Sequence, residues 1–377
     1  MFIGVPREDH RHEHRVGLSP SSVARLTRRG HTVHLESGAG DGAHFSDQVF
    51  EEVGAQIVYS KEEVYRRADL VCRVGWVSVE ELEMVKPGLA LCGFHHLAVA
   101  PRAKVRRLLE IEATVIGYEL IRDRDGHFAI LPPMSEMAGQ MAVQIAAHYL
   151  QTEVGGRGIL LGNVPGVPPP TVLILGAGTV GRTAARLALD SGAHVILIDD
   201  ALSKLRAASH ELDGRPVTAM ANARNLGRYS AFADVVIGAV LIPGSRAPYL
   251  MTEDMVKAMK PGSVIIDLSI DQGGCVETSR PTTPENPTFV AHEVIHYCVP
   301  NMTANIARTA TRALANAATP YVLEMAEKGV ESAIRTHPGL AAGVYVYKGE
   351  LVNQQVAEAL ELSATPLEEL FSEGTEA

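Results

Sequence analysis

Short apolar runs alternate with amphipathic segments along the first part of the chain. The apolar runs are typical of strands and fall at residues 2–5, 31–36, 56–59, 70–74, 89–94 and 114–119. Between the first two runs, Ser19 and Pro20 mark the start of a helix and Gly30 marks its end. This alternation of strands and helices predicts an α/β layer structure with a largely parallel sheet.

A second pattern of the same kind follows. Apolar residues at four-residue spacing from Met137 to Tyr149 predict a long helix that follows Ser135, and the Gly- and Pro-rich stretch 155–170 is typical of a linker. Further strands are predicted at 172–175, 195–198, 233–240 and 263–268. Residues 301–329 are again helical in pattern, with a kink or restart expected at Pro320. Because 377 residues exceed the about 100–200 of an ordinary domain, we predict two domains bridged by helices.

A glycine-rich loop carries the strongest chemical signal. Gly176, Gly178 and Gly181 follow an apolar strand directly and open a helix, which is the arrangement that binds a dinucleotide pyrophosphate. Asp199 ends the next predicted strand, where a carboxylate accepts hydrogen bonds from ribose hydroxyls and repels a 2′-phosphate. The loop therefore predicts NAD as cofactor, in preference to NADP. The alternative for Asp199 is a plain turn residue beside Asp200.

Charge and hydropathy exclude two classes of partner. The net charge is −10 and no basic stripe is present, so nucleic acid is not expected to bind. With 46% hydrophobic residues but no apolar run of about 18–20 residues, the chain is not expected to enter a membrane.

The cysteines and histidines give no sign of a metal site. The four cysteines form no C-x-x-C pair, so neither a zinc site nor a disulfide framework is expected. The stretch 10–14 is rich in histidine but lacks defined ligand spacing, and we interpret it as a solvated loop. Together with the lack of a signal-peptide pattern, these features favour a cytoplasmic protein.

Three residues are candidates for binding an amino or oxo acid or for catalysing its reaction. Arg15 follows the first strand, and its planar fork suits a carboxylate. His96 ends an apolar run and can pass protons near neutral pH, and Asp271 precedes two glycines at a strand end. Each also has an ordinary interpretation: a surface arginine, a core histidine and a turn residue.

The constellation resembles the alanine dehydrogenase and transhydrogenase alpha-subunit family from residue 1 to about residue 362. The resemblance rests on the segments IGVPRE, HRVGLSP, ESGAGDGAHFSD, FHHLA, PPMSEMAGQMA, LLGNVPGVPP, LILGAGTVG, IDLSIDQGGC and YCVPNMTANIARTAT. It implies two Rossmann-like, doubly wound α/β domains with the active site in the cleft between them. The implied substrate domain comprises residues 1–130 and 307–377, and the implied NAD-binding domain residues 131–306.

The same resemblance implies roles for individual residues. Arg15 would clamp the substrate carboxylate, His96 would act as acid and base, and Asp271 would lie beside the reacting carbon and the nicotinamide. The residues implied to contact the cofactor are Ser135, Val240, Asn301 and Met302. The implied reaction is reversible oxidative deamination of an L-amino acid such as L-alanine to the 2-oxo acid and ammonia, in a homo-oligomer that is usually a hexamer.

One departure from the family concerns the substrate. Where alanine dehydrogenases carry Lys-Val-Lys-Glu-Pro, this chain has Arg73-Val74-Gly75-Trp76-Val77, so glycine replaces the lysine that helps to bind substrate. Arg73 could compensate from the same face of the strand, or have another task. Trp76 could form the floor of an enlarged pocket, although we expect it to pack in the core.

Because Gly75 replaces the substrate-binding lysine of the family, the sequence leaves several functions as alternatives. The leading hypothesis is an NAD-dependent amino-acid dehydrogenase. The alternatives are an opine-type oxidoreductase for a bulkier amino or oxo acid, a transhydrogenase-like nucleotide-binding protein, and an inactive protein that senses NADH.

Overall fold

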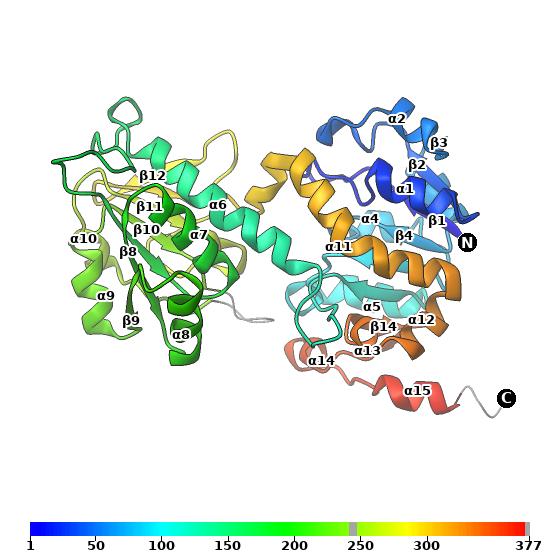
Figure 1. Cartoon of the computed structure of the whole chain (residues 1–377). Coiled ribbons are helices and arrows are strands. Elements are labelled where there is room, and N and C mark those ends of the chain that lie inside the picture. Colours follow the sequence, from blue (N-terminus) through cyan, green and yellow to red (C-terminus); the bar gives the residue numbers. More distant parts are fainter. Residues whose placement is uncertain (241–246, 374–377) are drawn as a thin grey trace. The chain divides into compact units, whose positions relative to one another are not determined.

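The computed structural model describes residues 1–240 and 247–373 (Figure 1). The chain divides into two compact units: Met1–Met134 with Ala304–Ala377, and Ser135–Thr303. The first unit thus combines both ends of the chain, and the second is one continuous segment. No helix in the described ranges is long and apolar enough to cross a membrane.

The sheet of the first unit has the order β15-β14-β6-β5-β4-β1-β2-β3. Its strands are β1 (Phe2–Val5), β2 (Thr32–Glu36), β3 (Gln56–Val58), β4 (Leu70–Cys72), β5 (Ala90–Gly93), β6 (Thr114–Gly117), β14 (Val344–Tyr347) and β15 (Glu350–Leu351). The pairs from β1 to β6 are parallel, and β14 and β15 add an antiparallel edge. The predicted α/β class is confirmed. Because β1 lies between β4 and β2, the strand order reverses there, which is where ligands bind in open α/β sheets.

Helices cover this sheet and connect its strands. They are α1 (Pro20–Thr27), α2 (Asp47–Glu52), α3 (Lys61–Arg67), α4 (Val79–Leu82), α5 (Arg102–Glu110), α11 (Ala307–Lys328), α12 (Val330–Thr336), α13 (Pro338–Ala341), α14 (Gln354–Leu360) and α15 (Leu367–Glu373). Ser19 caps α1 by accepting a hydrogen bond from the Ser22 N–H, as predicted. The helix α11 continues through Pro320 as one element, which excludes a restart and leaves the kink as the alternative that the sequence predicted.

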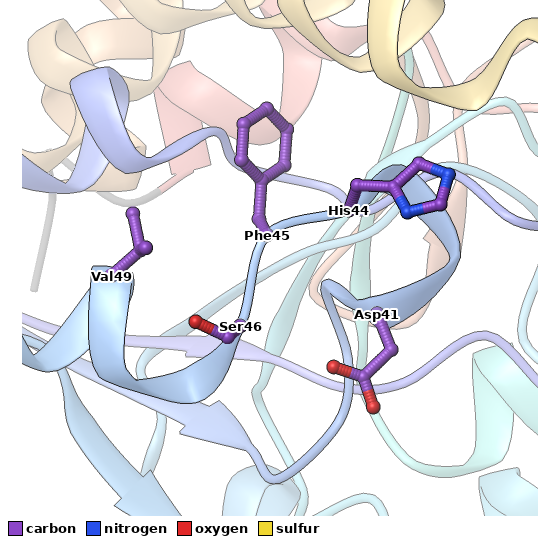
Figure 2. Close-up of a pocket in the computed structure, with 5 residues that line it drawn as sticks. All are labelled: Asp41, His44, Phe45, Ser46 and Val49. Atoms are coloured by element: carbon purple, nitrogen blue, oxygen red, sulfur yellow. The ribbon is translucent and has the colours of Figure 1, made fainter.

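Between β2 and α2 a short turn borders a pocket on the surface of the first unit (Figure 2). The turn is the 3₁₀ helix η1 (Asp41–Ala43), and the pocket has a volume of about 430 Å³. Its lining residues are Asp41, His44, Phe45, Ser46 and Val49.

The second unit has the strand order β12-β13-β11-β10-β7-β8-β9. Its elements are α6 (Leu131–Tyr149), which enters the unit at Ser135, β7 (Thr171–Leu175), α7 (Thr179–Asp190), β8 (His194–Asp199), α8 (Leu202–Glu211), β9 (Val217–Met220), α9 (Ala223–Ser230), β10 (Val235–Gly238), α10 (Glu253–Lys257), β11 (Val264–Asp267), β12 (Thr288–Ala291) and β13 (Val294–Tyr297). All strand pairs are parallel except β12 with β13. Since α6 begins at Leu131, Ser135 lies inside the helix rather than ahead of it.

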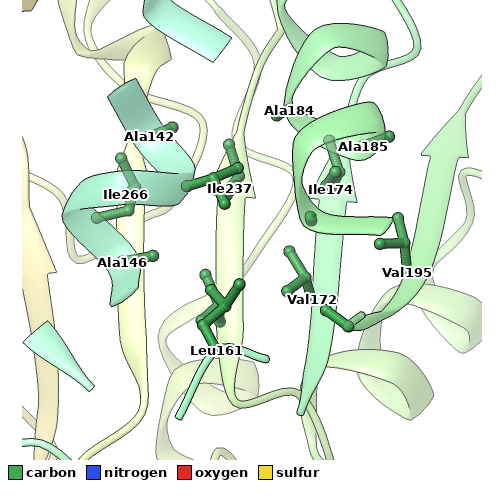
Figure 3. Packing of buried hydrophobic residues seen from close by; sticks show 14 of the residues in the cluster. Ala142, Ala146, Leu161, Val172, Ile174, Ala184, Ala185, Val195, Ile237 and Ile266 are labelled. Carbon is green, nitrogen blue, oxygen red and sulfur yellow. The ribbon is translucent and has the colours of Figure 1, made fainter. Parts of the chain in front are cut away.

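Alternate residues of the central strands pack on opposite faces of this sheet. Val172 and Ile174 of β7 belong to one core with alanines of α6 and α7 (Figure 3). Leu173 and Leu175 belong to the core on the other face. Because both faces are covered, the strands appear in the sequence as continuous apolar runs. The small alanines allow the two helices to lie close to the strands.

Candidate functional site

Arg15 lies buried in the segment that follows β1. Its side chain is 6% exposed, and its Nε and Nη2 atoms donate to the two carboxylate oxygens of Glu13 at 2.7 and 2.6 Å. The Nη1 atom lies 3.5 Å from the sulfur of Met134. The guanidinium fork of Arg15 is thus engaged by the planar carboxylate of Glu13.

The backbone of His96 is fixed by a hydrogen bond, whereas its imidazole ring is accessible to solvent. It adopts a left-handed conformation with φ 46° and ψ 45°, which is uncommon for a residue other than glycine. Its N–H donates to Oε1 of Glu119 at 2.6 Å, and its Nδ1 lies 3.7 Å from the same oxygen. The side chain is 50% exposed and stacks on Phe94. The imidazole is therefore placed to exchange protons with a molecule at the surface of this unit.

Glu119 is a site residue that we missed in the sequence. It follows β6, is 7% exposed and accepts a hydrogen bond from the Tyr345 hydroxyl at 2.8 Å. Its position at the end of the strand predicted at 114–119 was the available signal, because acidic residues there are rarely buried without a partner.

Arg73 takes part in a buried ion-pair network. It is 2% exposed, and its Nη2 lies 3.0 Å from Oε2 of Glu8 and its Nη1 2.9 Å from Oε2 of Glu81. Nη1 also donates to the Tyr65 hydroxyl at 2.8 Å. Because protein carboxylates engage both terminal nitrogens, the structure argues against the predicted contact of Arg73 with substrate.

The segment beyond β4 leaves space beside Gly75. The N–H groups of Val74 and Gly75 donate to Glu8 at 2.6 and 3.4 Å, so the Glu8 carboxylate fixes this backbone. A Cβ atom built on Gly75 would have only Oε2 of Glu8 within 4 Å, at 3.5 Å. Trp76 is 45% exposed, so our expectation that it packs in the core is wrong.

In the second unit each glycine of the predicted loop has a distinct physical reason. Gly176 has φ 106°, which other residues rarely adopt. A Cβ on Gly181 would lie 1.8 Å from the carbonyl oxygen of Gly176, so only glycine lets α7 pack this closely. Gly178 precedes the first residue of α7, and a Cβ there would meet no atom within 4 Å. The loop and the helix N-terminus leave room for a pyrophosphate against the backbone.

Asp199 ties the end of β8 to this loop. It is 7% exposed, its Oδ2 accepts the N–H of Ala177 at 2.7 Å, and its Oδ1 accepts the N–H of Ala201 at 2.8 Å. The ammonium of Lys204 lies 3.8 Å from Oδ1. The carboxylate is thus fixed beside the glycine loop, where the sequence placed it.

Asp271 lies in the 3₁₀ helix η4 (Leu268–Gln272) that follows β11. Its Oδ1 accepts the N–H of Asn301 at 3.0 Å, so two predicted site residues are in contact. The Val240 N–H donates to Oγ of Ser269 in the same turn. Met302 is 4% exposed and belongs to the core, which leaves its backbone rather than its side chain for a ligand.

Asp267 organises this turn and was not foreseen. Its carboxylate accepts N–H groups of Ser269, Cys275 and Val276. Burial raises the pKa of Asp267, while the hydrogen bonds lower it in part. Its signal in the sequence was its place as the last residue of an apolar strand.

Two further polar features lie apart from these residues. The pocket of Figure 2 is lined by none of the predicted site residues. Asp123, Asp125 and His127 could offer three metal ligands, but they lie in a turn in which Asp125 and His127 are exposed.

Comparisons with known proteins cover nearly the whole chain. Residues 4–138 match the family Alanine dehydrogenase/PNT, N-terminal domain, and residues 142–354 match its C-terminal domain. The alanine dehydrogenase of Mycobacterium tuberculosis H37Rv is 45% identical over 96% of this chain and 97% of its own, and that of Halomonas elongata is 44% identical over 96% and 97%.

Comparison with solved structures gives the same family. An L-alanine dehydrogenase has a TM-score of 0.90 and 41% identity over 96% of this chain and 99% of its own. A transhydrogenase from Sinorhizobium meliloti, with a TM-score of 0.80 and 24% identity over 94% and 99%, shares the fold. The chain therefore belongs to the alanine dehydrogenase/PNT family.

Proposed function

We propose that the protein is an NAD-dependent amino-acid dehydrogenase that interconverts L-alanine, or a related L-amino acid, with its 2-oxo acid and ammonia. The observation that carries the proposal is His96, whose accessible ring is anchored through its N–H to the buried Glu119, in a chain that matches alanine dehydrogenases over nearly its full length. Such a ring can move protons at neutral pH.

In this proposal Arg15 binds the substrate carboxylate with its guanidinium fork, exchanging the Glu13 contact for one with substrate. NAD, held by the glycine loop and Asp199, would supply the acceptor for the hydride that leaves the α-carbon. Water then adds to the resulting iminium carbon, His96 takes up and returns the protons, and ammonia departs from the tetrahedral carbon. Asp271 is proposed to lie beside the reacting carbon.

The second unit is proposed to hold NAD. Gly176, Gly178 and Gly181 provide a cradle that fits a pyrophosphate, since the space outside Gly178 is open. Asp199 is proposed to accept the ribose hydroxyls, and its carboxylate disfavours NADP. Further contacts are proposed for Ser135, Val240, Asn301 and Met302.

Arg73 is proposed to act through Glu8 rather than on substrate directly. It fixes Glu8, which in turn fixes the backbone at Val74 and Gly75. The open space at Gly75 favours a second candidate within the same chemistry, an amino or oxo acid with a side chain larger than that of alanine.

The setting of the enzyme is also a proposal. All four cysteines are free and buried, which supports a reducing compartment such as the cytoplasm. The family relationship supports a homo-oligomer, and light scattering after gel filtration would distinguish a hexamer from a smaller assembly.

The test follows NADH absorbance with ammonium and a panel of 2-oxo acids that runs from glyoxylate and pyruvate to 2-oxo acids with longer side chains. We expect turnover with at least one acid, and a loss of about 10²- to 10⁴-fold in kcat for His96→Ala. NADH binding by His96→Ala should match the native protein. No turnover on any acid, with NADH still bound, would favour a transhydrogenase-like or inactive nucleotide-binding protein.

A further inference from the structure

The strand β14 carries a local irregularity in its pairing with β6. In this antiparallel pair Val344 lies opposite Ile116, and Val346 lies opposite Val115. The register therefore shifts by one residue at Tyr345. A β-bulge of this kind redirects a side chain, and bulges are frequent beside active sites. Tyr345 thus occupies a position at which the backbone itself departs from the regular strand.

The end of β6 leaves room for the ring of Tyr345. A Cβ atom on Gly117, the last residue of β6, would overlap Cε2 of this ring and lie 3.0 Å from Cδ2. Any side chain at Gly117 would force the ring to move, so glycine allows the ring to lie directly against the strand. Because Tyr345 is only 4% exposed, this packing also fixes the direction of its hydroxyl.

One oxygen of Glu119 links Tyr345 to His96. Oε1 accepts the Tyr345 hydroxyl at 2.8 Å and the His96 N–H at 2.6 Å. Oε2 is buried and has no hydrogen-bond partner in the part of the chain that the structure describes, so the two bonds to Oε1 hold the carboxylate. Burial and the charge of Glu119 raise the pKa of the Tyr345 hydroxyl, which therefore stays protonated and donates at neutral pH.

The position of this oxygen affects both the backbone and the ring of His96. The left-handed conformation of His96, with φ 46° and ψ 45°, costs conformational energy, and the hydrogen bond to Oε1 of Glu119 compensates for it. The ring Nδ1 lies 3.7 Å from the same oxygen. A displacement of Oε1 would therefore loosen the turn at His96 and move the negative charge beside its imidazole.

We propose that Tyr345 is a positioning residue of the dehydrogenase: its hydroxyl holds Oε1 of Glu119, and Glu119 holds His96 where the imidazole exchanges protons with the substrate. This inference rests on the proposed function. Tyr345 acts through Glu119 and touches neither substrate nor cofactor. Its contribution therefore lies in kcat, and not in the binding of the 2-oxo acid or of NADH.

The experiment compares Tyr345→Phe with the native enzyme in reductive amination of the 2-oxo acid that has the highest turnover. The substitution keeps the ring against Gly117 and removes only the hydroxyl, so the fold should be retained. We expect kcat to fall about tenfold, because His96 is less well placed, while the KM of the 2-oxo acid and the affinity for NADH change by less than about twofold. An unchanged kcat would overturn the inference.

Tyr347→Phe is the matched control. Tyr347 lies on the same strand and is also 4% exposed. Its buried hydroxyl has no hydrogen-bond partner among the described residues, so its removal should leave kcat unchanged. A similar loss of kcat in both variants would reflect a general response of β14 to substitution, and would contradict a specific role of Tyr345.

A double-mutant cycle separates positioning from a merely structural role. Glu119→Met removes the carboxylate through which the hydroxyl acts, and Tyr345→Phe is then added to it. Because the hydroxyl has no acceptor left, its removal should now change kcat by less than about twofold. A further loss of about tenfold in the double variant would show that Tyr345 acts independently of Glu119, and the inference would be wrong.

Hydrogen exchange at the His96 amide gives a readout that needs no turnover. This amide should exchange faster in Tyr345→Phe than in the native protein, because its acceptor Glu119 is less firmly held, and should keep its native rate in Tyr347→Phe. Native exchange in Tyr345→Phe would overturn the inference. Failure of the dehydrogenase proposal itself would look different, as absent turnover of every 2-oxo acid by the native enzyme.

Discussion

Arg73, Glu8 and Glu81 form a network in which three charges are removed from water together. Their side chains are 2%, 3% and 3% exposed, so their charges compensate one another, and the ammonium of Lys61 lies a further 3.2 Å from Oε1 of Glu81. Such a network contributes little net stability when complete, but removal of one member leaves an uncompensated buried charge.

Arg73→Met should therefore destabilise the protein by about 3–5 kcal/mol, because Glu8 would remain buried without its cationic partner and Glu81 would keep only Lys61. Urea unfolding followed by circular dichroism measures this change. Arg107→Met, at a more exposed arginine, is the matched control and should cost less than about 1 kcal/mol. A small effect of Arg73→Met would show that the carboxylates are hydrated or protonated.

A substitution at Asp199 tests whether this residue determines the preference for NADH over NADPH. Asp199→Ala should weaken NADH binding by about tenfold or more, since a charged acceptor is lost. It should also narrow the preference for NADH over NADPH, since the charge that repels a 2′-phosphate is gone. Fluorescence titrations with both cofactors give the ratio. A ratio equal to that of the native protein would assign Asp199 only its structural contacts with Ala177 and Ala201.

Residue type alone did not determine the environment of neighbouring residues. His95 and His96 are adjacent and chemically identical, yet His95 is 2% exposed and His96 is 50% exposed. The difference arises from the left-handed turn at His96, which the sequence does not encode in an evident way. Trp76 is a similar case, because its exposure depends on the turn after β4.

At the scale of elements, we predict that alanine substitutions at two glycines of the loop before and within α7 have different effects. Gly178→Ala should keep the native melting temperature, because its Cβ meets no protein atom, but should weaken NADH binding where the pyrophosphate approaches. Gly181→Ala should lower the melting temperature, because its Cβ would overlap the Gly176 carbonyl and push α7 away. Thermal unfolding and NADH titration of both variants separate the effects. Equal NADH affinity for Gly178→Ala and the native protein would contradict the assignment of the loop.

In the second unit, periodicity predicted β7, β8, β10 and β11 but missed the edge strands β9 and β12 and the buried strand β13. The apolar runs at 172–175 and 195–198 correspond to β7 and β8. The edge strands β9 and β12 were missed, because three of the four residues in β9 are exposed and none of β12 is buried, so neither has a continuous apolar run. Their place in the sheet is set by pairing with β8 and β13, which is tertiary information.

At the scale of the whole molecule, the two units differ in how the chain builds them. The second unit is one continuous segment with its own core on both faces of its sheet, whereas the first needs both ends of the chain. The resemblance to the family implied this division, with boundaries at 130/131 and 306/307, and the apolar pattern predicted bridging helices after Ser135 and from residue 301. The compact units meet at 134/135 and 303/304.

Residues 135–303 expressed alone should fold cooperatively and bind NADH without catalysing any reaction, because Arg15 and His96 are absent. Circular dichroism and NADH fluorescence test both points, with Gly178→Ala in the same fragment as the control for specific binding. A folded fragment without affinity for NADH would mean that the first unit contributes to the cofactor site.

The central proposal is that hydride passes between NADH and the α-carbon of an amino acid. The most direct measurement supplies NADH deuterated at the transferring C4 position, with ammonium and the preferred 2-oxo acid, and examines the product by NMR. We predict an L-amino acid that carries deuterium on its α-carbon, formed about 10²- to 10⁴-fold more slowly by His96→Ala. Consumption of the label without deuterium at that carbon, or no consumption with any 2-oxo acid, would contradict the proposal.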